Sequence, residues 1–184
     1  MKNLFLVGYR CTGKSSVARR IAEKLGWNVV DADERMMEYT GESVAETVSK
    51  GGWPLFRKIE KDTLRSICMN SGQVVATGGG VVEDDENIDL MKQSGAVVWL
   101  RASSDTILKR MIRDTNSSDL RPPLTDFELK VEIEGTLTKR TPLYRIAMTL
   151  EVDTEDKTLI EVSSEVISLL KRIGSVKMPP DTDS

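Results

Sequence analysis

Short apolar runs alternate with longer amphipathic stretches along this chain. Five runs rich in branched aliphatic residues predict β-strands over 4–7, 27–30, 74–77, 96–100 and 148–152. Helical patterns separate these runs, and such alternation is typical of a parallel sheet covered by helices. The pattern therefore predicts an α/β fold, a three-layer α/β/α sandwich around a five-stranded parallel sheet.

Apolar residues at every fourth position indicate where helices lie. After the first strand, Val17, Ile21 and Leu25 recur at this spacing, and Gly26 is a suitable helix stop. Helices are also expected over 33–69, 103–113, 126–145 and 159–173, with breaks at Gly41, at Gly51-Gly52 with Pro54, and near Pro142.

Length and composition indicate one soluble domain. The 184 residues are 39% hydrophobic and 30% charged, enough for one hydrophobic core. We expect a single domain over 1–174, with a polar segment at about 114–125 that suits a mobile lid. The polar, acidic tail over 175–184 is expected to be disordered.

Charge and residue usage exclude several classes of function. The net charge of −3 argues against nucleic-acid binding through bulk positive charge, and no apolar run reaches the roughly 20 residues that span a bilayer. The chain has no histidine, which excludes a histidine base and makes a zinc site unexpected. Its two cysteines, Cys11 and Cys68, suggest no disulfide framework, so a reducing cytoplasm is the expected location.

A glycine-rich segment between the first strand and the first helix matches G-x-x-x-x-G-K-[ST] at every fixed position, from Gly8 to Ser15. Its backbone N–H groups and the following helix favour phosphate, Lys14 adds a point charge, and the Ser15 hydroxyl suits Mg²⁺. The sequence therefore predicts an ATP site. Its predicted contacts are Gly8, Arg10, Cys11, Thr12, Gly13, Lys14, Ser15 and Ser16.

Cys11 lies between the two glycines of this loop and allows two interpretations. It is a small packing residue, which we favour, or a reactive thiol whose pKa is lowered by the helix N-terminus and Lys14.

Further polar and glycine residues follow the predicted strands, where ligands bind in parallel sheets. Asp31 and Asp33 follow the second strand and could serve Mg²⁺ and a hydroxyl proton, or equally cap a helix. Three glycines at 78–80 follow the third strand and permit close approach of a ligand to the backbone. Arg57 and Glu60 share a helix face at i,i+3, which in isolation is usually a solvated ion pair.

Taken in order, these segments resemble the shikimate kinase family, from residue 4 to about 170. The resemblance rests on 8–15, 31–33, 56–60, 78–80, 120–124 and the R-x-P-L-Y segment at 140–145. It implies that ATP and Mg²⁺ are used and that the γ-phosphoryl group passes to the 3-hydroxyl of shikimate, giving shikimate 3-phosphate and ADP. It also suggests a monomer, and it implies that the helices at about 33–60 bind the substrate and that 114–125 is the lid. Together with the charge, the hydropathy and the cysteine usage, we expect a cytoplasmic enzyme with no nucleic-acid or membrane partner.

The resemblance implies roles for the acceptor side of the site. Asp33 matches the carboxylate that accepts the hydroxyl proton. Arg57 and Arg140 match the pair that binds the substrate carboxylate, as planar guanidinium groups do well. Gly79 and Gly80 match backbone donors to the substrate.

The donor side is assigned in the same way. Lys14 and Arg121 match catalytic cations, and Arg121 lies in the lid. Ser15 and Asp31 match the magnesium ligands, and Arg110 matches the residue whose guanidinium stacks on adenine.

Some residues depart from the family pattern, and two rival functions stay open. Trp53 stands where glutamate is usual, and Ala32 where threonine is frequent. The lid reads Arg-Pro-Pro-Leu from Arg121, where Arg-Pro-Leu is commoner. Another kinase of this fold, acting on gluconate or a nucleoside monophosphate, is one rival. A catalytically silent relative that binds ATP as a scaffold is the other.

Overall fold

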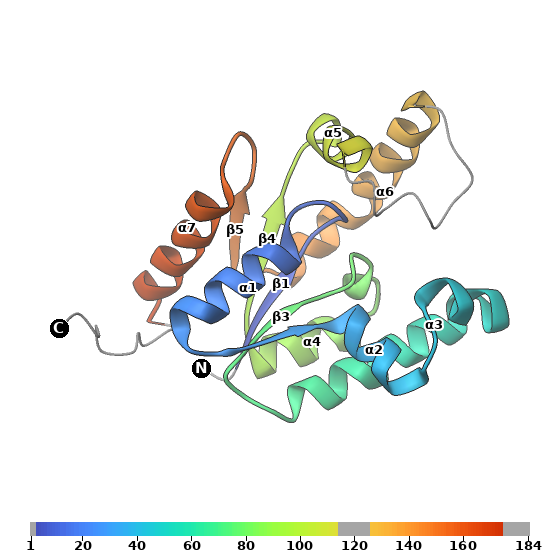
Figure 1. Ribbon diagram of the computed structural model, residues 1–184, viewed down its shortest axis with the longest axis horizontal. Coiled ribbons are helices and arrows are strands. Elements are labelled where there is room, and N and C mark those ends of the chain that lie inside the picture. Colours follow the sequence, from blue (N-terminus) through green and yellow to red (C-terminus); the bar gives the residue numbers. More distant parts are fainter. Residues whose placement is uncertain (1–2, 114–125, 175–184) are drawn as a thin grey trace.

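A five-stranded parallel sheet forms the centre of the molecule (Figure 1). The computed structural model describes residues 3–113 and 126–174. All adjacent strands pair in parallel, in the order β2-β3-β1-β4-β5. The strands are β1 (Asn3–Val7), β2 (Asn28–Asp31), β3 (Gln73–Ala76), β4 (Gly95–Arg101) and β5 (Leu150–Asp153). The predicted fold class is confirmed.

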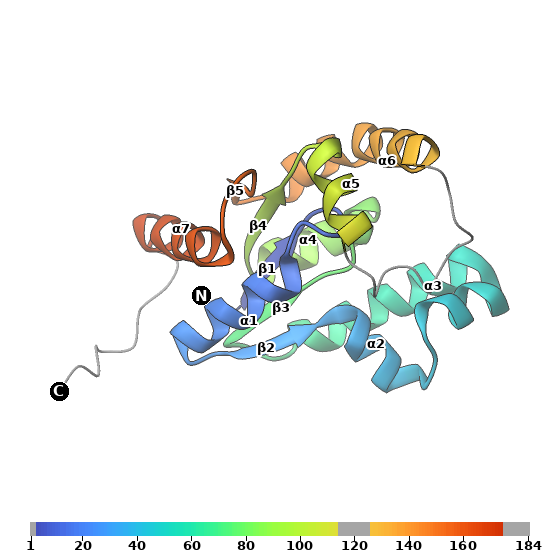
Figure 2. The same cartoon turned by 45° about the horizontal axis from the view of Figure 1, so that its top comes forward.

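Helices cover both faces of this sheet (Figure 2). They are α1 (Lys14–Leu25), α2 (Ala32–Thr40), α3 (Val44–Cys68), the 3₁₀ turn η1 (Val81–Glu83), α4 (Asp85–Ser94), α5 (Ser104–Arg113), α6 (Asp126–Ala147) and α7 (Leu159–Arg172). Helices α1 and α7 pack on one face, and α3, α4 and the C-terminal part of α6 pack on the other.

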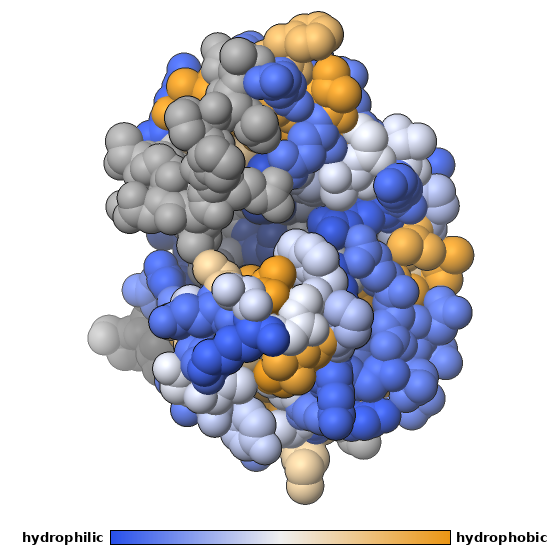
Figure 3. All heavy atoms as spheres, turned by 90° about the vertical axis from the view of Figure 1, so that its right-hand side faces the viewer, coloured by the Kyte–Doolittle hydropathy of each residue, from blue (hydrophilic) through white to orange (hydrophobic). Residues whose placement is uncertain are grey.

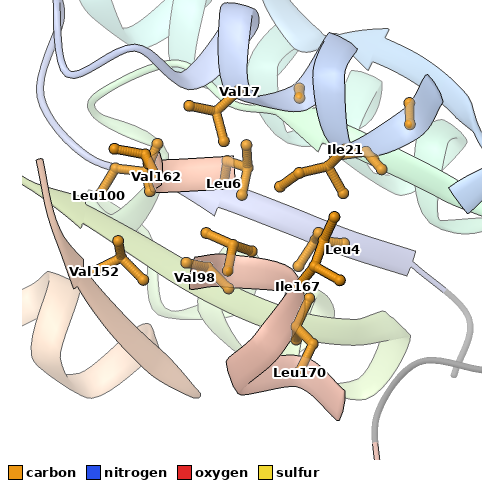
Figure 4. Close-up of a cluster of buried hydrophobic side chains, with 14 of the residues drawn as sticks. Leu4, Leu6, Val17, Ile21, Val98, Leu100, Val152, Val162, Ile167 and Leu170 are labelled. Atoms are coloured by element: carbon orange, nitrogen blue, oxygen red, sulfur yellow. The ribbon is translucent and has the colours of Figure 1, made fainter. Parts of the chain in front are cut away.

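The two faces of β1 show why the strand sequences are continuously apolar. Leu4 and Leu6 point into the cluster beneath α1 and α7 (Figure 4), whereas Phe5 and Val7 enter the cluster on the opposite face. Successive side chains of a strand point to opposite sides, so a sheet covered twice buries both sets. This burial holds the carboxyl ends of β1, β2 and β3 in fixed relative positions.

Glycines produce the predicted breaks between helices. Gly26 ends α1 with a left-handed φ of 64°, and Gly41 ends α2 with φ 71°. Inside α3, Gly52 has φ 69° and a non-helical ψ, which kinks the helix just before Pro54. Only glycine adopts such a conformation without strain, so the kink is set locally.

The expected break near Pro142 is wrong, because α6 continues through this residue to Ala147. Proline lacks the N–H that would bond the carbonyl four residues earlier, which usually weakens a helix. Here Ile133 on one side of Pro142, and Tyr144 and Ala147 on the other, are fully buried. Burial of both halves of α6 keeps the helix continuous.

The predicted lid (114–125) and tail (175–184) lie outside the described residues, and so does Arg121. Within the described part of the chain, none of the helices combines the length and the apolar character needed to cross a membrane.

Candidate active site

The phosphate loop joins β1 to α1 and leaves no space for a side chain at its first glycine. A Cβ atom on Gly8 would lie 2.4 Å from the carbonyl oxygen of Leu100, and the φ of Gly8 is 143°. Gly13 is also left-handed, at φ 92°, directly before α1. The Thr12 hydroxyl donates to the carbonyl of Tyr9 at 2.8 Å and braces the turn. The loop therefore has the tight curvature that its sequence predicts.

The Lys14 ammonium lies over this loop. It donates to the carbonyl oxygens of Gly8 (2.9 Å) and Tyr9 (2.8 Å). Burial lowers the pKa of Lys14 to about 8, although the carboxylates of Asp33 and Asp31 act in the opposite direction. A buried cation is costly without anions, so this position favours binding of the negatively charged phosphates.

Asp31 has two roles at the end of β2. One carboxylate oxygen accepts from the N–H groups of Asp33 (3.1 Å) and Glu34 (3.4 Å), which caps α2. The other accepts from the Ser15 hydroxyl at 2.7 Å. The helix-cap interpretation of this aspartate is therefore confirmed, and its role towards Mg²⁺ stays a prediction. A carboxylate and a hydroxyl at this distance offer the oxygen ligands that Mg²⁺ prefers.

A cavity of about 290 Å³ opens beside the loop, between α3, α6 and the end of β3. A hollow with hydrophilic residues at its bottom is visible on this side of the molecule (Figure 3). Its lining includes the five residues predicted to bind the acceptor and the adjacent Gly78: Asp33, Arg57, Gly78, Gly79, Gly80 and Arg140. The structure therefore brings together every acceptor residue predicted from the sequence.

Two arginines from different helices share one carboxylate next to this cavity. Arg57 donates from one Nη to Glu60 at 2.6 Å and from the other to Glu83 at 2.5 Å. Arg140 donates through Nε to the second oxygen of Glu83 at 2.7 Å. The guanidinium carbon of Arg57 also lies 5.3 Å from the ring centroid of Phe56 and 5.8 Å from that of Trp53. This environment fixes the arginines as a pair.

The glycine run at the end of β3 lies against these arginines. A Cβ on Gly80 would lie 2.2 Å from an Nη of Arg57, and one on Gly79 would lie 3.6 Å from an Nη of Arg140. The Gly79 carbonyl accepts from the Tyr144 hydroxyl at 2.6 Å. The run therefore lets the backbone and both guanidinium groups border the same space.

Burial also changes the acidity of the carboxylates here. Burial, with the charge of Asp31, raises the pKa of Asp33 against the opposing charges of Lys14 and Arg57. Burial likewise raises the pKa of Glu60, although Arg57 opposes the shift. A carboxylate with a raised pKa is a stronger base, which suits proton transfer near neutral pH.

Two further predicted residues lie at the edges of the loop. Arg110 donates to the hydroxyl (3.0 Å) and carbonyl (2.7 Å) of Thr154, after β5, and to the carbonyl of Cys11 at 3.4 Å. The Arg10 side chain borders the acceptor cavity and pairs with Glu132 of α6 at 3.4 Å. Adenine stacking by Arg110 and phosphate contacts by Arg10 stay predictions.

Comparison with known proteins agrees with this geometry. The family model for shikimate kinase matches residues 10–171. A shikimate kinase from Thermodesulfovibrio yellowstonii is 40% identical over 177 residues, covering 96% of this chain and 99% of the relative. The structure of a shikimate kinase from Acinetobacter baumannii in complex with shikimate superposes with a TM-score of 0.86 at 28% identity, covering 94% of each chain.

The chain belongs to the shikimate kinase family. As a shikimate kinase it is an ATP-dependent phosphotransferase, which confirms the predicted enzyme class. A gluconokinase structure from Sinorhizobium meliloti matches with a TM-score of 0.56 at 18% identity, which shows a shared fold alone.

Sequence reasoning missed several residues that build this shikimate kinase site. Glu83 was not assigned, although it lies three residues after the last glycine of the run. Thr154, which holds Arg110, and Tyr144, which holds Gly79, were also missed. Each acts through a contact distant in sequence, so only the R-x-P-L-Y segment containing Tyr144 offered a local signal.

Proposed function

We propose that this kinase transfers the γ-phosphoryl group of ATP to the 3-hydroxyl of shikimate, with Asp33 as the base. The observation that carries the proposal is the cavity in which Asp33 and the two arginines of an anion clamp lie next to the phosphate loop. A small acceptor with one hydroxyl to phosphorylate and one carboxylate matches those groups.

Asp33 receives the proton in this mechanism. The acceptor hydroxyl oxygen attacks the γ-phosphorus, the bond to the bridging oxygen of ADP breaks, and the hydroxyl proton moves to the Asp33 carboxylate. The raised pKa of Asp33, caused by burial and Asp31, supports this role. Asp31, and not Asp33, caps α2, so the Asp33 carboxylate is not used as the cap of this helix.

Arg57 and Arg140 bind the acceptor carboxylate and so orient the ring. Together with the backbone at Gly79 and Gly80, they position the hydroxyl in line with the phosphate. Phosphoryl transfer depends mainly on positioning and charge neutralisation, which such a site supplies.

The donor is held by the phosphate loop from Gly8 to Ser16, with Lys14 and the lid residue Arg121 neutralising charge on the transferred group. Ser15 and Asp31 would hold Mg²⁺, which when bound neutralises phosphate charge; their contact at 2.7 Å supports this assignment. Arg110 would stack on adenine.

The first test is ADP release with shikimate, gluconate and nucleoside monophosphates as separate acceptors. We expect turnover with shikimate alone. Asp33→Asn should abolish turnover and retain ATP binding, whereas the control Glu34→Gln, in the same helical turn, should remain active. Unchanged turnover of Asp33→Asn would disprove the base assignment. Turnover with gluconate alone would show that gluconate, and not shikimate, is the acceptor.

We also propose that residues 1–174 form one domain and that the enzyme acts as a cytoplasmic monomer without nucleic-acid or membrane partners. The family membership supports this arrangement. Light scattering coupled to gel filtration should give the mass of one chain, 20.5 kDa, and a mass of twice that value would contradict it.

A further inference from the structure

Glu83 connects the two arginines of the acceptor site. It lies in η1, directly after the glycine run, and each of its carboxylate oxygens accepts from a different guanidinium group. Arg57 comes from α3 and Arg140 from α6, so this carboxylate joins two helices that are far apart in the sequence.

The Glu83 carboxylate contacts both arginines without lining the cavity itself, as far as the described residues show. Both arginines line the described part of the cavity, and Glu83 is absent from that lining. It uses Nε of Arg140, while an Nη of Arg140 points towards Gly79 at the cavity wall. The bridge therefore leaves donors of the pair directed at the cavity.

The electrostatics require a partner of this kind. Two guanidinium groups side by side repel each other, and both are largely withdrawn from water, with side chains of Arg57 and Arg140 exposed by 24% and 19%. Glu83 opposes the repulsion with two charge-assisted hydrogen bonds. Burial by itself raises the pKa of Glu83, but the hydrogen bond and charge of Arg140, with the charge of Arg57, outweigh it and lower the pKa. The bridge is therefore ionised at neutral pH.

We propose that Glu83 is a positioning residue that holds Arg57 and Arg140 side by side in the geometry that binds the acceptor carboxylate. The inference rests on the proposed function. It distinguishes Glu83 from Glu60, which among the described residues forms an ion pair with Arg57 but not with Arg140 and itself lines the cavity.

A different role predicts the opposite result. If the Glu83 carboxylate occupied the place of the substrate carboxylate, its removal would free the arginines and lower the KM for shikimate. If it positions them, its removal lets the like charges separate and raises that KM. The sign of the change therefore decides between the roles.

The experiment compares steady-state kinetics of Glu83→Gln, Glu83→Ala and Glu83→Asp with the wild type. For Glu83→Gln and Glu83→Ala we expect the KM for shikimate to rise roughly tenfold. This is the effect of losing one charged hydrogen bond between the arginines and the substrate carboxylate. The kcat and the KM for ATP should stay within about twofold, since the chemistry and donor site are untouched. Glu83→Asp keeps the charge on a shorter stem and should restore part of the affinity.

The matched control is Glu86→Gln. Glu86 lies three residues further on and pairs with Lys61 (3.1 Å) and Arg65 (3.0 Å), outside the cavity lining. Its kinetics should equal those of the wild type. A shikimate analogue with a hydroxymethyl group in place of the carboxylate should show equal KM values for wild type and Glu83→Gln, because it does not engage the clamp.

If the wild type is active and the KM for shikimate is unchanged or lowered in both Glu83→Gln and Glu83→Ala, the positioning role is overturned while the proposed function stands. A wild type without shikimate-dependent ADP release would overturn the proposed function and this inference with it. Equal effects of Glu83→Gln on both acceptors would also overturn the role, because the change would then not act through the carboxylate.

Discussion

The donor and acceptor halves of the site are built in different ways. The centre of the donor half, the phosphate loop over 8–15, is one continuous segment held by its own backbone and by the loop contacts of Lys14 and Thr12. The acceptor half joins residues of α2, α3, the end of β3 and α6, and ion pairs among side chains hold its arginines. A segment that folds locally tolerates changes elsewhere, whereas an assembled cluster depends on every contributing element. Variants of the two halves should therefore affect the two substrates separately.

Lys14→Met should give the largest effect and should act on the donor alone. Removing this cation should lower kcat about a thousandfold, because it neutralises charge on the transferred group. Shikimate binding, followed by the fluorescence of Trp53 at the cavity, should persist. The exposed Lys24→Met on the same helix is the control. Loss of shikimate binding in Lys14→Met would mean that the halves are not independent.

Arg57→Lys tests the acceptor half. Lysine keeps the charge but lacks the planar fork that serves Glu60 and Glu83 together, so the KM for shikimate should rise about thirtyfold with little change in that for ATP. Arg65→Lys, on the same helix and paired with Asp62 and Glu86, should behave as wild type. A matching rise in the KM for ATP would contradict the separation.

The pH dependence of ATP binding should show a smaller, donor-specific effect. Burial lowers the pKa of Lys14 to about 8, so the ammonium loses its proton as the pH rises through 8. Above this pH, ATP affinity should then fall by at most about tenfold for each further pH unit. The negative charge of the bound phosphates favours the protonated form of Lys14, so ATP binding at such a pH takes up a proton. Calorimetry in buffers of different ionisation enthalpy should detect this proton uptake near pH 8. The uptake should be absent in Lys14→Met; its persistence there would assign it to another group.

Cys11→Gly should give the smallest effect and should settle the role of this thiol. Cys11 has a φ of 60°, a left-handed conformation that costs a residue with a Cβ about 1 kcal/mol more than glycine. The greater flexibility of glycine in the unfolded chain offsets part of this gain, so stability should change by less than about 1 kcal/mol. Thermal unfolding and steady-state kinetics measure both properties. A large loss of kcat would indicate a chemical role for the thiol and contradict simple packing.

The elements with strong local signals were predicted best from the sequence. Helix α1 ends at Leu25, directly before the predicted stop at Gly26, and the breaks at Gly41 and Gly52 occur where glycine supplies a backbone conformation that other residues resist. The phosphate loop is equally local. Pro142 misled the prediction because its local effect is outweighed by burial of Tyr144 and Ala147 further along α6.

The acceptor residues needed the family resemblance, since Arg57 with Glu60 reads in isolation as an ordinary surface ion pair. The structure alone shows that Glu83 joins Arg57 to Arg140 and that Arg10 borders the acceptor cavity.

The sequence by itself determined the alternating strands and helices, the parallel sheet and the phosphate loop, because these depend on residue periodicity and on neighbours in the chain. Only the tertiary structure decided which carboxylate joins the two arginines, which lysine and aspartate change their pKa, and whether α6 continues through a proline. Those properties arise from burial and from charges that are distant in sequence and adjacent in space, and no local pattern encodes them.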